Sequence, residues 1–151
     1  MTRYEGGPAD SPGFLLWHAT LRWQRAMARA LAPHGLTHVQ FVLLACAWWL
    51  NESGAAPNQL ALARQAGTDV KMTSDVLRRL EVRGLVDRMT DPRDTRARTV
   101  RVTPDGLSLV QRAMRDVEDA DEAFFTPASD PAPLVEILRR LAAVSPTTVS
   151  R

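Results

Sequence analysis

Arginine side chains concentrated in one stretch of the chain carry its most specific chemistry. Residues 60–103 contain ten basic and six acidic residues, whereas the rest of the chain contains nine basic and eleven acidic ones. Because the whole 151-residue chain has a net charge of only +2, the local excess, and not the bulk charge, indicates contact with phosphate groups. Arginine suits bidentate contacts to phosphates and bases and insertion into narrow minor grooves. A GC-rich coding bias explains the arginine usage equally well.

Other chemistries are not indicated by the sequence. It contains no Ser-His-Asp pattern, no phosphate-binding loop and no paired acids that would mark an enzyme. His18, His34 and His38 do not share one helix at metal-ligand spacing, and no cysteine or acidic cluster accompanies them. The single cysteine, Cys46, lies among apolar residues, which is more typical of a buried thiol than of a redox sensor. We therefore expect no enzymatic activity, no metal and no cofactor.

The residues around the arginines predict a helix-turn-helix. Ala63 is small, so two helices can approach closely there, and Gly67 can adopt the left-handed backbone of the turn. Asp69 is the predicted N-cap of the second helix, over about residues 70–83, and Gly84 ends it. The inward face of this helix is expected to consist of Thr73, Val76, Leu77 and Leu80. The exposed face is expected to carry Lys71, Ser74, Asp75 and Arg78.

Two short runs of alternating side chains, residues 86–90 and 98–103, predict a β-hairpin after the second helix. Between them, residues 91–98 form the predicted Arg-rich tip, in which Asp91-Pro92 supplies the turn. A helix-turn-helix followed by such a hairpin is a winged helix-turn-helix, whose natural partner is double-stranded DNA. The sequence therefore predicts a mainly α fold (α+β) with a winged helix-turn-helix lobe at about residues 37–103.

Further helices are predicted on both sides of the recognition elements. Residues 13–31 form a predicted helix with a wide apolar surface. Residues 37–51, capped by Thr37, form a second helix that is apolar all round and therefore central. Thr103-Pro104-Asp105 is a strong helix start, and the last helix begins at Ser129 or Asp130 with Pro131.

The outer helices predict how the chain is organised as a whole. Their apolar faces have no obvious partner inside a small DNA-binding lobe, and the same helices of a second subunit would bury them. We therefore expect a single domain over residues 13–144, with dimerisation helices at about residues 13–31 and 104–144. Residues 1–12 and 145–151 are expected to be a flexible N-terminus and a flexible tail.

The chain resembles the multiple-antibiotic-resistance regulator (MarR) family of bacterial transcription factors over about residues 14–141. The matching elements, taken in order and spacing, are Gly35-Leu36-Thr37, Leu62-Ala63-x-x-x-Gly67, Leu80-Glu81-x-x-Gly84-Leu85-Val86, Asp91-x-Arg93-x-x-Arg96 and Val102-Thr103-Pro104-Asp105-Gly106. The resemblance implies a triangular α-helical homodimer with its recognition helix in the major groove and its wing near the minor groove. It also implies repression that a small ligand or oxidation usually relieves.

Two features depart from the family pattern. Asp75 lies on the exposed face of the recognition helix, where family members more often carry neutral or basic residues. Its carboxylate can accept a hydrogen bond from a cytosine amino group, repel phosphate, or pair with Arg78 or Arg79. Cys46 lies in the central helix, whereas members that sense peroxide have a cysteine near the start of the first helix.

The candidate DNA contacts come from the recognition helix and from the tip of the hairpin. They are Lys71, Ser74, Asp75, Arg78, Arg93, Arg96 and Arg98. Arg93 can instead pair with Asp91 and hold the shape of the hairpin. An arginine at the tip, such as Arg96, can enter a narrow minor groove.

Aromatic side chains provide a candidate effector pocket. A small aromatic molecule can be placed between the dimerisation helices and the DNA-binding lobe, in a pocket lined by Trp17, Trp23, Phe41 and Trp48. The competing interpretation is that these residues belong to the ordinary hydrophobic core, as aromatic residues at helical spacing usually do.

Taken together, these features predict a sequence-specific transcriptional regulator. We expect a repressor that acts as a homodimer on a (pseudo)palindromic operator and is released by a small-molecule effector. The alternative is a protein-interaction adapter of the same fold with weak or lost DNA binding, which the near-neutral net charge and Asp75 favour. No apolar run reaches the roughly 18 residues needed to cross a bilayer, and a signal peptide is not evident, so a cytoplasmic location is expected.

Overall fold

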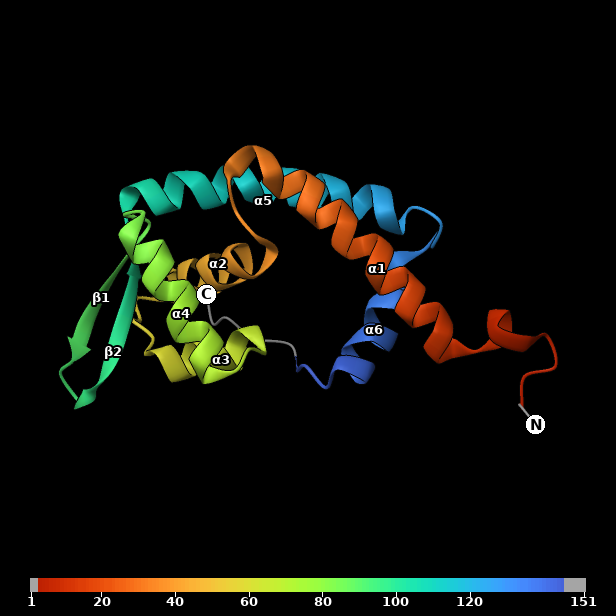
Figure 1. Cartoon of the computed structure of the whole chain (residues 1–151), viewed down its shortest axis with the longest axis horizontal. Helices are drawn as coiled ribbons and strands as arrows, with labels where there is room; N and C mark the ends of the chain where they lie inside the picture. Colours follow the sequence, from red (N-terminus) through yellow and green to blue (C-terminus); the bar gives the residue numbers. More distant parts are fainter. Residues whose placement is uncertain (1–2, 146–151) are drawn as a thin grey trace.

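The computed structural model describes residues 3–145 and is mainly helical, with one small sheet (Figure 1). The mainly α fold with a two-stranded wing is therefore confirmed. Its elements, in chain order, are η1 (Gly7–Asp10), α1 (Pro12–Leu31), η2 (Ala32–His34), α2 (His38–Glu52), α3 (Gln59–Ala66), α4 (Val70–Val82), β1 (Val86–Asp91), β2 (Asp94–Val102), α5 (Pro104–Phe125) and α6 (Pro131–Ala142).

The chain ends and the domain boundaries remain predictions. Residues 7–10 of the segment expected to be flexible form the 3-10 helix η1, and the amide of Gly6 donates to Asp10 Oδ2 over 3.0 Å. All of the predicted tail except residue 145 lies outside the described residues.

The helices begin where polar side chains cap them. Thr37 and Gln40 form a reciprocal capping box at the start of α2, because each side chain bonds the other residue's backbone amide. Asp69 caps α4, Thr103 caps α5, and Asp130 caps α6. These four predicted caps are therefore present, and they fix where each helix starts.

The core is built around α2. Leu43, Leu44 and Ala47 of this helix are fully buried, as the all-round apolar sequence predicts. They pack in one cluster with Met27 of α1 and Leu77 of α4, among other residues. Figure 1 shows α1 and α5 running side by side, with α2, α3, α4 and the wing gathered beneath the start of α5. The recognition elements therefore rest on one continuous core.

The passage from α4 through the wing to α5 needs glycine at two points. Gly84 follows α4 with a φ of 71°, the left-handed conformation that ends the helix, and the amide of Leu85 donates to the carbonyl of Leu80. In α5, a Cβ at Gly106 would overlap the backbone carbonyl oxygen of Leu85. The absence of a side chain at Gly106 thus lets α5 lie directly against the start of the wing.

Two helical segments leave apolar side chains uncovered in the single chain. Trp17 near the start of α1 is 62% exposed, and the neighbouring Phe14, Leu15 and Leu16 are exposed as well. Helix α6 contains no buried residue, and Leu141 in its last turn is 71% exposed. Figure 1 shows α6 apart from the lobe that holds α2, α3 and α4. These faces are the ones expected to meet a second subunit.

Within residues 3–145, no single helix is both long and apolar enough to cross a membrane. Segments 12–34 and 38–52 reach that length and composition only together, as a pair bent by 74°.

Candidate nucleic-acid interface

The recognition helix α4 is anchored along one face and open along the other. Its predicted inward residues, Thr73, Val76, Leu77 and Leu80, are all buried. Thr73 fixes the first turn, because its hydroxyl donates to the carbonyl of Asp69 over 2.8 Å and lies 2.7 Å from the hydroxyl of Thr68. Opposite this face, Lys71 and Arg78 are exposed.

The predicted polar residues of α4 do not all reach solvent equally. Ser74 and Asp75 are half-buried, less exposed than the sequence predicts. Arg78 donates to the carboxylate of Asp75 over 2.9 Å, one turn along the helix. Three roles were considered for Asp75, and in the structure its carboxylate pairs with Arg78. This pairing leaves both side chains at the surface of the helix.

The wing is an antiparallel hairpin that is longer than predicted at its tip. Strand pairing joins Val86 to Val102 and continues to Thr90 and Arg98, after which the register jumps to Asp91 and Asp94. Of the eight residues predicted for the tip, only Pro92 and Arg93 form the turn, and the others lie in the strands. The strand pairing is irregular between Thr90 and Asp91. The second strand ends at Val102, one residue early, because Thr103 caps α5.

An arginine with a largely covered side chain joins the wing to the recognition helix. The guanidinium of Arg88 in β1 makes two hydrogen bonds to Glu81 Oε2 of α4, of 2.9 and 2.6 Å, and one of 3.1 Å to Gln59 Oε1 of α3. The side chain of Arg88 is only 9% exposed. Since the charged guanidinium donates two bonds to a carboxylate and one to a neutral amide oxygen, β1, α3 and α4 are held in one arrangement.

An asparagine joins the wing to the central helix. Asn51 of α2 donates to the carbonyl of Val100 over 3.2 Å, and its side-chain oxygen accepts from the amide of Val102 over 2.9 Å. The amide of Val100 also donates to the carbonyl of Pro57 over 2.8 Å. Neither Asn51 nor Arg88 was expected from sequence. Two sequence features could have indicated these roles. Asn51 is a polar residue near the end of an otherwise apolar helix, and Arg88 is a charged residue in a strand of alternating side chains.

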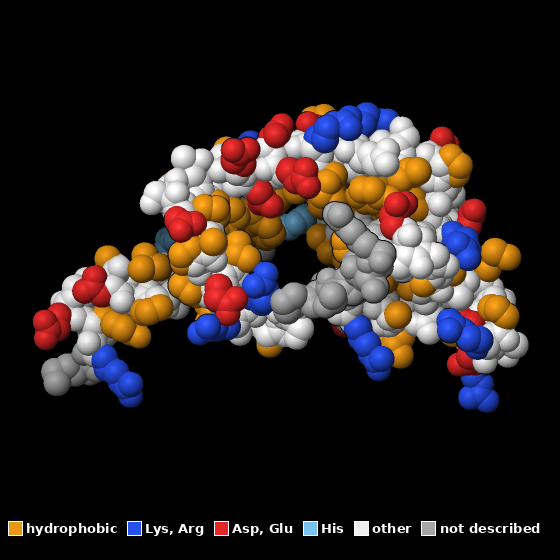
Figure 2. All heavy atoms as spheres, turned by 180° about the vertical axis from the view of Figure 1, so that it is seen from behind, with side chains coloured by type: hydrophobic (Ala, Val, Ile, Leu, Met, Phe, Trp, Pro, Cys, Tyr) orange, Lys and Arg blue, Asp and Glu red, His pale blue; other side chains and the backbone are white. Residues whose placement is uncertain are grey.

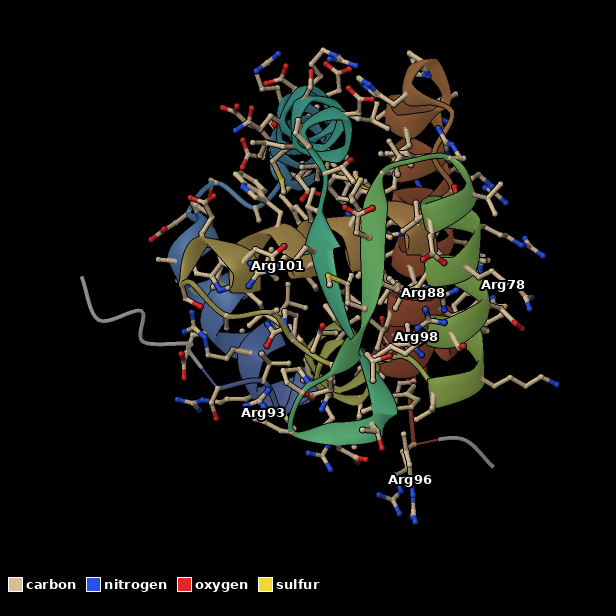
Figure 3. All side chains as sticks on the ribbon, turned by 90° about the vertical axis from the view of Figure 1, so that its left-hand side faces the viewer. Arg78, Arg88, Arg93, Arg96, Arg98 and Arg101 are labelled. Carbon is tan, nitrogen blue, oxygen red and sulfur yellow. The ribbon has the colours of Figure 1, made fainter. Side chains whose placement is uncertain are left out.

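The arginines at the wing tip differ in how they are held. Asp91 is almost fully buried, and one of its oxygens accepts from the amide of Arg93 over 2.9 Å and from its Nε over 3.4 Å. Arg93 therefore makes the pairing that would hold the hairpin's shape. Arg96 has its amide bonded to Asp94, and its side chain projects from the tip into solvent (Figure 3). Arg98 donates to the carbonyl of Arg88 over 3.4 Å and remains exposed.

The two recognition elements point to the same side of the molecule. Figure 1 shows the first turn of α4 and the wing tip at the same lower edge. Seen from behind, basic side chains project from this edge at the wing end (Figure 2). In Figure 3, Arg78 lies on the outer side of α4, whereas Arg88 lies between α4 and the hairpin. The arrangement places exposed basic side chains of α4 and of the wing on one edge, which suits an extended anionic partner.

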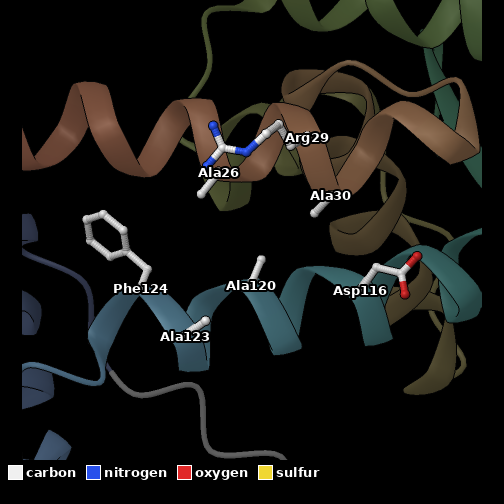
Figure 4. A pocket seen from close by; sticks show the side chains of 7 residues that line it. All are labelled: Ala26, Arg29, Ala30, Asp116, Ala120, Ala123 and Phe124. Carbon is white, nitrogen blue, oxygen red and sulfur yellow. The ribbon is translucent and has the colours of Figure 1, made fainter.

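The aromatic residues predicted to line an effector pocket have different surroundings. Trp17 is 62% exposed, Phe41 is buried in the core, and the indole of Trp48 donates to Glu52 over 3.3 Å. Trp23 donates to Asp121 over 2.7 Å and lies edge-on to His38. None of the four lines the groove of about 510 Å³ between α1 and α5. This groove is lined by Ala26, Arg29, Ala30, Asp116, Ala120, Ala123 and Phe124 (Figure 4).

Two titratable side chains on α2 are affected by burial. Desolvation raises the pKa of the half-buried Cys46 thiol, which disfavours the reactive thiolate. Desolvation lowers the pKa of His38, and the carboxylate of Asp121 partly opposes this shift. Among residues 3–145, no three His, Cys, Asp or Glu side chains gather into a group that could hold a metal ion.

The comparisons with known proteins point in one direction. A model of the MarR family matches residues 36–97. The uncharacterized HTH-type transcriptional regulator YdcH of Bacillus subtilis is 43% identical over 122 residues, which are 81% of this chain and 83% of YdcH. The HTH-type transcriptional repressor Rv2887 of Mycobacterium tuberculosis is 33% identical, over 74% of this chain and 78% of the repressor.

A solved structure gives the same result for the fold. BpsR of Bordetella bronchiseptica matches with a TM-score of 0.80 at 27% identity, over 96% of this chain and 100% of BpsR. That structure addresses how 6-hydroxynicotinic acid regulates the DNA binding of BpsR.

Proposed function

The chain belongs to the MarR family of transcriptional regulators, and on this premise we propose that it is a homodimeric repressor that binds a (pseudo)palindromic operator. Helix α4 enters the major groove, and the wing reaches the adjacent minor groove. The family consists of transcriptional regulators and not of enzymes. A cytoplasmic location is part of this proposal, since the operator lies there.

The observation that carries the proposal is the rigid placement of α4 and the wing on one edge. Arg88 of the wing bonds α3 and α4 from inside, so the backbone segments that carry the exposed cations keep fixed positions. The proposed contacts from α4 are Lys71, Ser74, Asp75 and Arg78. Those from the wing are Arg93, Arg96 and Arg98. Because the backbone is pre-organised, binding orders only the side chains and costs less entropy than ordering whole segments would.

The proposed homodimer rests on the uncovered apolar faces of α1 and α6. A repressor that reads two half-sites needs two copies of α4 at a fixed spacing. The relative Rv2887, named a repressor, supports the direction of regulation.

The proposed effector is a small aromatic molecule. The regulation of BpsR by 6-hydroxynicotinic acid supports this chemistry. Trp17, Trp23, Phe41 and Trp48 stay candidate pocket residues in the dimer. The groove of Figure 4 is a second candidate, because it combines the cation of Arg29 with the aromatic ring of Phe124.

Selection of bound duplexes from a random pool, followed by affinity measurements at several salt concentrations, tests the proposed function. We expect one palindromic sequence, bound as a dimer, and an affinity that falls steeply with salt as counterions are released. Replacing Lys71, Ser74 and Arg78 singly by Ala should weaken binding, and at least one change should alter the preferred sequence. If the protein binds no duplex at any salt concentration, the proposal is contradicted and the adapter function is favoured.

A further inference from the structure

Two exposed apolar side chains flank the lysine at the start of the recognition helix. Val70 is 55% exposed and Met72 is 45% exposed, and between them lies Lys71. An isolated apolar residue on a surface needs no explanation. Here, however, both residues lie in the single helical turn that is expected to meet base edges, and a cation that attracts phosphate stands between them.

The first turn of α4 is held firmly enough to place these side chains. The carboxylate of Asp69 accepts a hydrogen bond of 2.7 Å from the backbone amide of Met72 and so caps the helix. Thr73 is fully buried and bonds back to Asp69 and to Thr68. Because these hydrogen bonds hold the first turn of α4 in place, the backbone of Val70 and Met72 has a defined position although their side chains are exposed.

Helix geometry directs both side chains past the end of the helix. Cα–Cβ bonds tilt toward the helix N-terminus, so side chains of the first turn lean beyond it. Val70 and Met72 are separated by roughly 200° around the axis and therefore occupy opposite flanks of the turn. Recognition helices contact base edges mainly through their N-terminal residues. In the proposed complex the two side chains thus meet different base pairs.

The chemistry of the major groove leaves one target for such groups. Thymine is the base that presents a methyl group there, and apolar side chains read it by direct contact. We infer that Val70 and Met72 are specificity-determining residues that read thymine methyl groups in the half-site. The inference rests on the proposed DNA-binding function and adds a chemical class of contact to the polar contacts of α4.

Replacing thymine by uracil in the selected duplex tests the inference, because this change removes the methyl group and keeps the base pairing. For the wild-type protein, affinity should fall about fourfold at one or two thymines of each half-site, the factor for one lost methyl contact. Val70→Ala should abolish the uracil effect at one thymine, and Met72→Ala should abolish it at another. Met72→Gln, which keeps the length and loses the apolar end, should behave as Met72→Ala does.

Salt dependence and a matched variant provide the controls. Apolar contacts release no counterions, so Met72→Ala should leave the slope of log affinity against log salt unchanged. Val82→Ala changes an apolar residue that is 83% exposed on the same helix, roughly 18 Å along the axis from Val70, and should retain every uracil effect. Circular dichroism of each variant checks that α4 remains folded.

The outcomes separate the inference from the function on which it rests. Absence of salt-dependent binding to any duplex would refute the proposed function and the inference with it. Sequence-specific binding that no uracil substitution weakens would overturn the inference alone. Uracil effects of equal size in the wild type, Val70→Ala and Met72→Ala would do the same, because the methyl groups would then be read by other side chains.

Discussion

At the scale of single residues, the wing tip distinguishes two arginines that look equivalent in sequence. Arg93 is tied to the buried carboxylate of Asp91, whereas the side chain of Arg96 projects from the tip. Arg93 can still touch a phosphate, since its side chain is 79% exposed, but its pairing restricts where the guanidinium goes. A guanidinium that enters a minor groove needs the freedom that Arg96 has.

Replacing Arg96 by Ala should weaken operator binding by roughly 1–3 kcal/mol and reduce the salt slope by about one, because one cation leaves the interface. Arg93→Ala is the matched change and should have a smaller effect on affinity. Fluorescence anisotropy with labelled operator at several salt concentrations measures both quantities. Unchanged affinity of Arg96→Ala near physiological salt would place this residue outside the interface.

His38 links protonation to stability. Burial holds its pKa below the usual value of 6.5, with Asp121 opposing, so the unfolded chain takes up a proton more readily than the folded protein. Ionisation of His38 therefore has no effect on folding well above pH 6.5, and it destabilises the folded protein as the pH falls from 6.5 through the lower folded pKa. Acidification from pH 7.5 to 5.5 should lower the Tm of the wild type more than that of His38→Gln. His18→Gln, at an exposed position of α1, is the control, and its Tm should fall between pH 7.5 and 5.5 by as much as that of the wild type.

At the scale of elements, the sequence was sufficient for the helix starts that a predicted cap defines, but it missed the Ser11 cap of α1, which begins one residue earlier than expected. The caps Thr37, Asp69 and Thr103 act over three residues, so their spacing predicts them directly. The wing was predicted less well, because the jump in register beside Asp91 depends on pairing between two strands. The bonds of Arg88 to Gln59, 29 positions earlier, and of Asn51 to Val102 depend on the assembled fold. A single sequence does not reveal contacts over such separations.

The junction between the wing and α5 depends on the absence of a side chain at Gly106. Replacing it by Ala would place a Cβ against the carbonyl of Leu85, a backbone atom that cannot rotate away, so α5 must shift. We expect a loss of about 1–3 kcal/mol in unfolding free energy, the usual cost of overpacking, together with weaker DNA binding as the wing moves. Gly13→Ala, in α1 with open space around the new methyl group, should cause no loss. Urea denaturation measures both, and equal stability of the two variants would show that the junction tolerates a Cβ.

At the scale of the whole molecule, the proposed dimer makes stability and function depend on the same uncovered surfaces. The start of α1 and the whole of α6 place large apolar side chains in solvent, while the C-terminal half of α1 and the first part of α5 share one buried core with α2, α4 and the wing. Burial of apolar area at about 25 cal/mol per Å² is the main driving force for association. A second subunit that covers these faces would stabilise the fold and also set the distance between the two recognition helices.

Deleting residues 131–151 tests this link without changing any proposed DNA contact. The truncated chain should lose the dimer, expose the start of α1 further, and aggregate or unfold, so that operator binding disappears. Deleting residues 146–151 alone is the control and should leave assembly intact.

Because a truncation can fail simply by misfolding, Leu141→Glu provides a second test. It places a charge on an exposed position of α6, which the free monomer tolerates and a dimer interface does not. Sedimentation at micromolar concentration should show that the Leu141→Glu protein no longer forms the dimer. A stable dimer of either altered protein on a palindromic operator would show that α6 does not form the interface.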